Sequence, residues 1–256
     1  MGMRILVTND DGIHAPGLDI AAEIARALSD DVWVIAPELD QSGVAHSLSL
    51  NDPLRMREVT ERRFAIKGTP TDCVIMGVRH ILNGKGPDLV ISGVNRGSNT
   101  GEDVTYSGTI AGAMEGTILG IPSVALSLAY GQETRLRPHW ETALQFGPDL
   151  IRKVLAAGMP RDVLVNINFP DCMPDEVKGI AVTSQGRRAQ EWIRIDPRHD
   201  GRGIPYFWIA FTRGEQPRPI HGTDLAAVAD HRIAVTPLRI DMTDEPFMTQ
   251  LAELLD

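Results

Sequence analysis

The sequence predicts an α/β fold of the Rossmann type, a doubly wound and mostly parallel sheet with a C-terminal β-hairpin extension. Over about the first 170 residues, short runs of β-branched and aliphatic residues alternate with segments whose apolar residues recur at helical spacing. The intervals between these runs are long enough to hold the crossover helices that parallel strands require. Polar, glycine-rich segments follow three of the predicted strands, at the edge where ligands of open α/β sheets bind.

The expected core elements follow one another in chain order. Buried strands are expected at 4–8, 32–36, 88–92, 122–127 and 163–168, with a hairpin around 54–67. Helices are expected at 18–28, at 108–119 and at 139–157. A further helix ends near residue 82 and begins at Thr71 or Asp72, either of which suits an N-cap.

The pattern changes after about residue 170. Strands are expected near 180–183, 206–211 and 233–236, separated by clusters of Arg, Gly and Pro. This tail predicts an antiparallel appendage, or an arm that packs on a neighbouring subunit. We therefore expect one domain over residues 1–256, with a core to about 170 and a C-terminal extension with closing elements from about 171.

Charge and cysteine content limit the class of partner. The chain has 34 acidic and 25 basic residues, and a net charge of −9 repels nucleic-acid backbones and anionic membranes. We therefore expect no polymeric nucleic acid and no membrane as partner. Its two cysteines, Cys73 and Cys172, lack metal-ligand spacing, and the N-terminus lacks the pattern of a signal peptide. These features favour a cytoplasmic protein.

Three polar clusters are expected to meet at the carboxyl edge of the sheet. They cover residues 9–12 after the strand at 4–8, 40–47 after the strand at 32–36, and 92–99 after the strand at 88–92. Asp10 and Asp11 are adjacent carboxylates, which repel each other unless a cation lies between them. Mg²⁺ and Mn²⁺ prefer carboxylate, amide and hydroxyl oxygens, and Asp10, Asp11, Ser42 and Asn95 supply that set. The alternative is that Asp-Asp-Gly is an ordinary turn.

The segment from Ser107 to Thr109 opens a helix of small residues. Free amides and the positive end of the helix dipole favour a phosphate there, and Gly108 lets the backbone come close to an anion. Asn99 precedes this helix within one connection. Ordinary helix capping by Ser107 or Thr109 is the alternative.

Other residues are secondary candidates for the site. Asn9 and His46 are candidates for phosphate binding, and a loop histidine is also compatible with a plain surface position. The segment 69–72 could line the site or form a turn with an N-cap. Arg187 and Arg188 are candidates for contact with a phosphate or a base, or are simply solvated.

Five blocks of the sequence together resemble the SurE family of survival-protein nucleotidases. They are ILVTNDDG, AP..DQSGVAHSLSL, GTPTDCV, PDLVISGVNRGSNTGEDVTYSGTIAGAMEG and GTDLAAV…VTPL, and they run in order over nearly the whole chain. The resemblance implies a metal-dependent 5′-nucleotidase that releases phosphate from nucleoside monophosphates, with broad activity that extends to 3′-nucleotides and short polyphosphate. It also implies a cytoplasmic homodimer or homotetramer whose subunits exchange the C-terminal hairpin.

The resemblance assigns the same metal ligands that donor chemistry selects. Its ligand positions fall on Asp10, Asp11, Ser42 and Asn95, with one divalent cation per subunit, and its phosphate positions fall on Asn99, Ser107, Gly108 and Thr109. One departure is visible, because Asp230-His231-Arg232 stands where the family usually has a Gly-Tyr pair.

The hypothesis is metal-assisted hydrolysis in which Asp10, Asp11 and Asn99 are the catalytic residues, and Asp10 orients or deprotonates water. Attack by an Asp carboxylate, which would give an aspartyl-phosphate, stays open. A nucleotide-binding module without turnover and a phosphatase for another substrate are the alternative functions.

Overall fold

A computed structural model describes residues 2–82, 84–188, 193–211 and 219–255 of the protein. Its centre is a nine-stranded sheet with the order β3-β4-β2-β1-β5-β6-β7-β11-β8. The six strands from β4 to β7 in this order are mutually parallel, and β3 and β11 run antiparallel to their neighbours β4 and β7. The bounds are β1 (Arg4–Thr8), β2 (Asp31–Pro37), β3 (Arg55–Thr60), β4 (Arg63–Lys67), β5 (Leu89–Arg96), β6 (Ser123–Leu128), β7 (Val163–Phe169), β8 (Ile180–Val182) and β11 (Ile233–Arg239).

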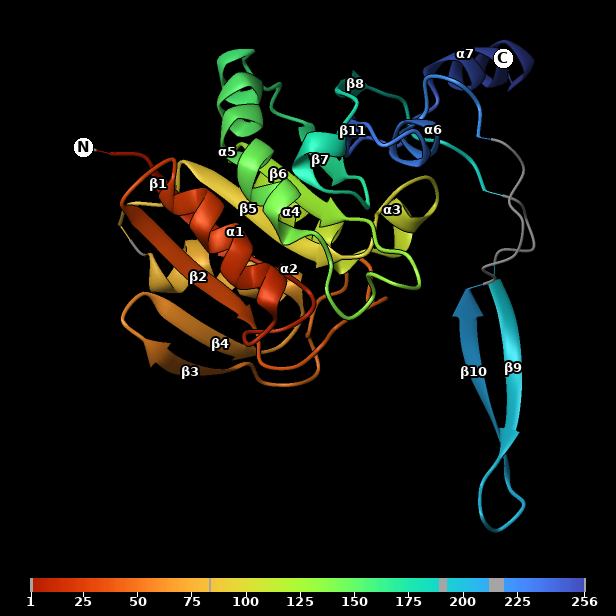
Figure 1. The fold of residues 1–256 in the computed structure, drawn as a ribbon, viewed down its shortest axis with the longest axis horizontal. Helices are drawn as coiled ribbons and strands as arrows, with labels where there is room; N and C mark the ends of the chain where they lie inside the picture. Colours follow the sequence, from red (N-terminus) through yellow and green to blue (C-terminus); the bar gives the residue numbers. More distant parts are fainter. Residues whose placement is uncertain (1, 83, 189–192, 212–218, 256) are drawn as a thin grey trace.

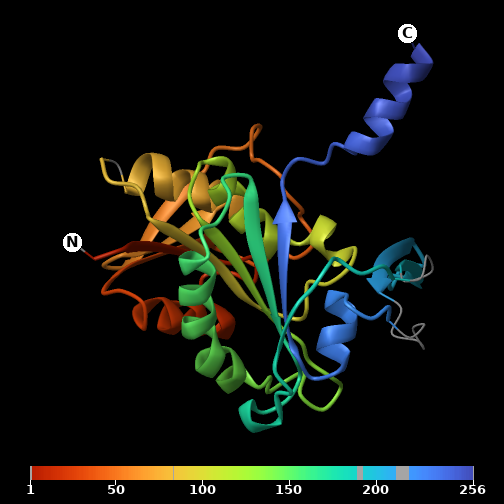
Figure 2. The same ribbon diagram turned by 90° about the horizontal axis from the view of Figure 1, so that it is seen from above.

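Helices cover both faces of this sheet, as Figures 1 and 2 show. On one face α1 (Pro16–Arg26) packs against α5 (Trp140–Ala156), and on the other α2 (Pro70–Met76) packs against α4 (Gly108–Ile118). The short helices α3 (Asp103–Tyr106) and α6 (Asp224–Ala229), the π-helical turn η1 (Gly77–Ile81) and the 3-10 turn η2 (Pro174–Glu176) complete the body. The predicted doubly wound α/β fold is confirmed.

The first strand shows how the sequence builds the two layers. Ile5, Leu6 and Val7 are all fully buried. Because side chains of a strand alternate between faces, Ile5 and Val7 join the hydrophobic cluster beneath α1 and α5, whereas Leu6 joins the cluster beneath α2. An uninterrupted apolar run is therefore what a strand buried on both faces requires.

Glycines at every fourth position bring α4 close to the sheet. A Cβ added to Gly112 would lie 2.8 Å from Oγ of Ser92, and one added to Gly116 would lie 2.8 Å from Cγ2 of Val90. Residues four apart share one face of a helix, so this face has no side chains to hold α4 away from β5. The close packing brings the start of α4, at Gly108, against the end of β1.

Several core elements differ from their expected bounds by one or two residues, and two differences change the local structure. α2 begins at Pro70 because Thr69, not Thr71 or Asp72, is its N-cap. The Thr69 hydroxyl accepts the Asp72 N–H at 3.2 Å, and the Asp72 carboxylate accepts the Thr69 N–H at 2.8 Å. The predicted strand at 88–92 extends to Arg96 as β5, with a register shift against β6 between Ser92 and Asn95. Asn95 therefore lies on a strand rather than in a loop.

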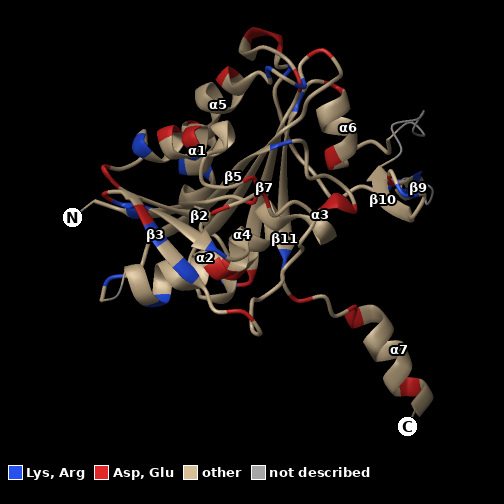
Figure 3. Cartoon of the chain, turned by 90° about the horizontal axis from the view of Figure 1, so that it is seen from below, with Lys and Arg blue, Asp and Glu red and all other residues tan. Residues whose placement is uncertain are grey.

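The C-terminal part divides between the sheet and two projecting elements. β8 and β11 are strands of the main sheet. β9 (Ile193–His199) and β10 (Pro205–Phe211) form an antiparallel hairpin outside it, which projects from the body in Figure 1. α7 (Glu245–Leu255) has no buried residue and stands apart in Figure 3.

The segment that departs from the family pattern forms the turn between α6 and β11. His231 adopts a φ of 57°, in the region that favours glycine. Arg232 donates from Nη2 to the carbonyl of Ile180 at 2.9 Å, which ties the turn to β8. None of the described helices has both the length and the apolar character needed to span a membrane.

Candidate active site

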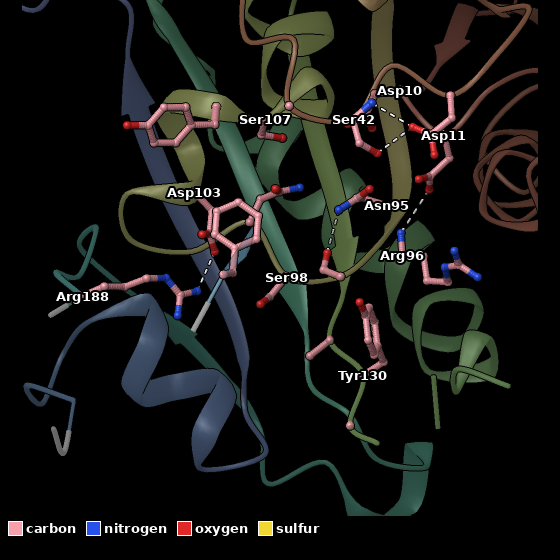
Figure 4. Close-up of a pocket in the computed structure, with 18 of the residues that line it drawn as sticks. Asp10, Asp11, Ser42, Asn95, Arg96, Ser98, Asp103, Ser107, Tyr130 and Arg188 are labelled. Carbon is pink, nitrogen blue, oxygen red and sulfur yellow. Dashed lines mark hydrogen bonds and ion pairs between the residues drawn. The ribbon is translucent and has the colours of Figure 1, made fainter. Parts of the chain in front are cut away.

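A cavity of about 710 Å³ opens at the carboxyl edge of the parallel strands. Asp10 and Asp11 follow β1, Asn95 lies near the end of β5, and Ser42 comes from the loop after β2, so residues distant in sequence meet there (Figure 4). The other side chains around it are Asp40, Arg96, Ser98, Asn99, Asp103, Tyr106, Ser107, Tyr130, Gln132, Arg188 and Phe211.

Asp10 is the most deeply placed acid of the cavity, with 4% of its surface exposed. Burial, helped by the negative charges of the nearby Asp11 and Asp40, raises the pKa of Asp10 from 3.8 to about 7. A hydrogen bond from Oγ1 of Thr109 to Oδ1 of Asp10, at 2.5 Å, opposes that rise. The ionised form of Asp10 is therefore costly in the protein alone, and any positive charge nearby would stabilise it.

Asp11 and Asp40 complete an acidic wall. Burial also raises the pKa of Asp11, although the Arg96 N–H, which donates to its Oδ2 at 3.2 Å, opposes the rise. Asp40 accepts both the hydroxyl hydrogen of Ser42, at 2.6 Å, and its N–H, at 2.8 Å. With its hydrogen donated to Asp40, the Ser42 oxygen presents lone pairs to its surroundings.

The donor set fits a hard divalent cation. Nδ2 of Asn95 donates to the carbonyl of Gly97 at 2.9 Å, so the amide oxygen is the end left to accept or coordinate. Two carboxylates of raised pKa, one hydroxyl and one amide oxygen are the ligands that Mg²⁺ and Mn²⁺ prefer. Among the described residues, no group of three His, Cys, Asp or Glu side chains is placed to hold a metal ion. The proposed donor set has only two carboxylates, with a hydroxyl and an amide as its other donors, so it does not require such a group.

Asn99 lies at the floor of the cavity, 7% exposed. Its Nδ2 donates to Oγ of Ser127 at 2.8 Å, and its peptide group is bonded by the side chains of Asn166 and Asn168. The loop that carries Asn99 is thus fixed to β6 and β7.

The start of α4 supplies one cavity residue and two supporting ones. Ser107 lines the cavity and caps the helix, because its hydroxyl accepts the Ile110 N–H at 3.1 Å. Thr109 is fully buried and reaches the site through Asp10. A Cβ on Gly108 would lie 2.7 Å from Cβ of Asp10, so this glycine allows the helix start to approach the carboxylate.

The structure does not bring every candidate to the cavity wall. Asn9 is fully buried and donates to the carbonyl of Gly12 at 3.1 Å, so it braces the turn that carries the two acids. Nε2 of His46 lies 2.9 Å from Oε2 of Glu115 on α4. Thr69 and Asp72 hold the same loop by bonds to the Ser47 carbonyl and the Ser49 N–H.

Of the two arginines, Arg188 lines the cavity and Arg187 is exposed. Arg188 donates from Nη2 to Oδ2 of Asp103 at 2.5 Å, and it fixes α3 to the segment after β8. Arg188 therefore has a defined place at the rim, opposite the acidic wall (Figure 4).

Three positions escaped the sequence analysis. Asp40 was assigned to a polar cluster without a role, although it holds Ser42. Asn166 and Asn168, which hold Asn99, are polar residues two apart in an otherwise apolar strand. Asparagine is disfavoured in strands, so this pair was a usable indication of a site beside β7.

Comparison with known proteins gives consistent matches. Residues 5–192 match the family described as Survival protein SurE. A protein named 5′-nucleotidase SurE from Methylobacterium sp. (strain 4-46) is 66% identical over 253 residues, which cover 99% of this chain and 100% of that one. Its namesake from Azorhizobium caulinodans is 66% identical, with 99% of each chain covered. The crystal structure of the SurE protein from Aquifex aeolicus superimposes with a TM-score of 0.83 at 42% identity, covering 99% of this chain and 100% of that one.

Proposed function

The chain belongs to the SurE family, and from this premise we propose that it is a metal-dependent 5′-nucleotidase that works in the cavity beside Asp10 and Asp11. It hydrolyses nucleoside 5′-monophosphates to nucleoside and phosphate. The names of relatives that match over their full length support this activity. The observation that carries the site assignment is the adjacent pair Asp10 and Asp11, both with raised pKa, beside Ser42 and Asn95 in one cavity.

Asp10, Asp11, Ser42 and Asn95 would hold one Mg²⁺ or Mn²⁺ ion per subunit. When bound, such an ion supplies positive charge that polarises the phosphoryl group and acidifies nearby water. Asp40 keeps the Ser42 hydroxyl oriented, and the Arg96 N–H holds Asp11. The chain thus arranges its ligands before the substrate arrives.

The remaining residues act on the phosphate and the water. In the hydrolysis, the water oxygen bonds to phosphorus while the bond from phosphorus to O5′ breaks, and O5′ takes up a proton from solvent as the nucleoside leaves. Asp10 is the carboxylate that takes a proton from the attacking water. Asn99 and the backbone amides at the start of α4, from Ser107 to Thr109, stabilise the charge on the phosphoryl oxygens.

A water nucleophile and an Asp nucleophile leave different traces. Direct attack by water transfers the phosphoryl group once and inverts the configuration at phosphorus, whereas an aspartyl-phosphate requires two transfers and gives net retention. Turnover of a nucleoside monophosphate whose phosphorus is made chiral by isotopic labelling distinguishes the two outcomes. Borohydride reduction of the acid-quenched enzyme would also convert a phosphorylated Asp10 or Asp11 to homoserine, which mass spectrometry of the peptides detects.

We further propose a cytoplasmic homodimer or homotetramer with broad specificity, including 3′-nucleotides and short polyphosphate. The hairpin exposes Phe207, Trp208 and Ile209, and large exposed apolar side chains favour a protein partner. Both cysteines are free thiols, which fits a reducing compartment.

The test is phosphate release by the purified full-length protein. Substrates are the four nucleoside 5′-monophosphates, a 3′-monophosphate, a short polyphosphate and a non-nucleotide phosphomonoester, each with Mg²⁺, Mn²⁺ or EDTA. The proposal requires release from 5′-monophosphates that EDTA abolishes and added metal restores. Binding of nucleotide without release would identify a sensing module, and preference for the non-nucleotide ester would identify a different phosphatase. Asp10→Asn, which removes one ligand charge, should abolish release while the fold survives.

A further inference from the structure

A row of polar residues crosses three neighbouring strands below the cavity. In the register of the sheet Asn95 of β5 pairs with Ser127 of β6, and Ser127 pairs with Asn168 of β7. Residues directly opposite one another on adjacent strands project from the same face and lie within reach of a common partner. For Ser127 and Asn168 that partner is Asn99.

Asn168 pairs with the peptide group of Asn99 at both ends of its amide. The Asn99 N–H donates to Oδ1 of Asn168 at 2.8 Å, and Nδ2 of Asn168 donates to the Asn99 carbonyl at 3.1 Å. Nδ2 of Asn166 donates to the same carbonyl at 2.8 Å. Asn166 and Asn168 are fully buried, so water does not compete for these bonds.

The arrangement is costly for stability alone. Asn166 and Asn168 lie two apart on one face of a central strand, a setting that favours β-branched and aromatic residues. The amide oxygen of Asn166 is buried and lacks a hydrogen-bond partner within the described part of the chain. An unsatisfied buried acceptor destabilises the folded state, and an apolar residue at this position would avoid that cost. The effect of the two side-chain amides is to fix the position of Asn99.

The side chain of Asn99 is fixed separately. Its Nδ2 donates one hydrogen to Oγ of Ser127 at 2.8 Å, which leaves the second N–H of the same amide for a ligand in the cavity. Asn99 lies in a connection between Gly97 and Gly101, both of which have positive φ angles. A glycine-flanked connection of this kind does not orient a side chain by itself.

We propose that Asn168, together with Asn166 and Ser127, positions Asn99 for phosphoryl transfer. We call the three residues the Asn99 clamp. The inference rests on the proposed nucleotidase function, because it needs Asn99 to contact the phosphoryl oxygens. The clamp itself does not touch substrate. Asn166 and Asn168 on β7 fix the Asn99 backbone, and Ser127 on β6 fixes the Asn99 side-chain amide. The second N–H of that amide is then placed to stabilise the negative charge that develops on the phosphoryl oxygens in the transition state.

A double-mutant cycle between Asn168→Ala and Asn99→Ala tests the clamp. Ser127→Ala is the second variant, because it removes only a hydroxyl and folds even if Asn168→Ala does not. Thr142→Val, on α5, is the matched control, since it removes one buried hydrogen bond from a side chain to the backbone carbonyl of Cys172. All proteins are assayed with a nucleoside 5′-monophosphate at saturating Mn²⁺, with enzyme in excess for the slow variants.

The clamp predicts a loss of kcat that depends on Asn99. Asn168→Ala and Ser127→Ala should each lower kcat by at least about tenfold, with a smaller change in KM, because a misplaced group weakens the transition state most. In the Asn99→Ala background the same substitutions should change kcat by less than about twofold, because the group they position is gone. The affinity for Mn²⁺ should stay within about threefold of wild type, and Thr142→Val should match wild-type kcat.

Two results would overturn the inference. One is a kcat within about twofold of wild type for both Asn168→Ala and Ser127→Ala. The other is an equal loss with and without Asn99, which is what general loosening of the sheet would produce. If the wild type and Thr142→Val turn over and Asn99→Ala is impaired, either result defeats the clamp alone. If the wild type releases no phosphate, the proposed function fails and the clamp fails with it.

Discussion

The hydroxyl of Thr109 donates a hydrogen bond of 2.5 Å to Oδ1 of Asp10, and both side chains are buried. This bond joins the first turn of α4 to the end of β1, across 99 residues of sequence. It stabilises the ionised carboxylate in a place where burial disfavours ionisation. Thr109 should therefore influence how readily Asp10, a proposed metal ligand, ionises.

Replacing Thr109 should weaken metal binding more than it weakens the fold. Thr109→Val keeps the shape and removes the hydroxyl, so the pKa of Asp10 should rise above about 7 and protonation of the carboxylate should compete with metal binding. We expect the affinity for Mn²⁺ at pH 7 to fall about tenfold, as titration calorimetry can measure. Thr109→Ser, which keeps the hydroxyl, is the control. Equal affinities for the two variants would contradict the role of the bond.

Stability of the metal-free protein should fall as the pH rises toward neutrality. The pKa of Asp10 is about 7 in the folded protein and 3.8 for the free side chain, so between these values the folded state binds one more proton than the unfolded state. The stabilisation that this proton gives is fully present below the lower pKa and is lost as the pH rises through the higher one. The free energy of unfolding should fall by up to about 1.4 kcal/mol per pH unit in between. Urea unfolding in EDTA at several pH values between these limits measures it.

Asp10→Asn is the matched variant for that measurement. An amide at this position cannot ionise, so the slope due to Asp10 should disappear and the metal-free variant should be more stable than wild type at pH 8. An unchanged slope in the variant would show that other groups cause it. The same variant is the one expected to lose phosphatase activity, so stability and activity should change in opposite directions.

Much of the fold followed from periodicity. The apolar run of β1 and the alternating helices predict parallel strands, and parallel strands place their carboxyl ends at one edge. That rule predicts that Asp10, Ser42 and Asn95 lie at one edge of the sheet, and the cavity contains all three. Polar clusters far apart in the sequence could be predicted to lie in one site because local patterns encode the direction and order of the strands. They do not encode the contacts between side chains.

Features that depend on tertiary contacts were not predictable in this way. The last residues of β5 have no apolar alternation, so its extension to Arg96 depends on pairing with β6. β9 contains Pro197, which disfavours a strand, and forms only by pairing with β10. The placement of Asn9 beneath the turn and of His46 beside Glu115 follows from packing against α4 and the neighbouring loop, which no local pattern encodes.

Gly108 should tolerate no side chain. A Cβ there would lie 2.7 Å from Cβ of Asp10 and 3.1 Å from its Oδ2, so Gly108→Ala must displace either the carboxylate or the start of α4. We expect a destabilisation of about 1–3 kcal/mol and a larger proportional loss of kcat. Gly86→Ala is the control, because a Cβ at this exposed glycine meets no atom within 4 Å. Full activity of Gly108→Ala would show that Asp10 need not stay in place.

The pair of His46 and Glu115 should act on the loop that carries Ser42. Nε2 of His46 lies 2.9 Å from Oε2 of Glu115, whose side chain is 9% exposed on α4, and His46 is four residues from Ser42. If the contact anchors the loop, His46→Ala and Glu115→Gln should both weaken Mn²⁺ binding, because Ser42 is then less well placed.

The double variant separates anchoring from direct contact with the phosphate. Anchoring predicts that His46→Ala combined with Glu115→Gln is no worse than His46→Ala alone, because both changes remove one interaction. It also predicts that saturating Mn²⁺ restores kcat to within about threefold of wild type. A histidine that donates to the phosphate predicts instead that His46→Ala lowers kcat at every Mn²⁺ concentration while Glu115→Gln has little effect. Steady-state kinetics over a range of Mn²⁺ concentrations distinguishes the two roles.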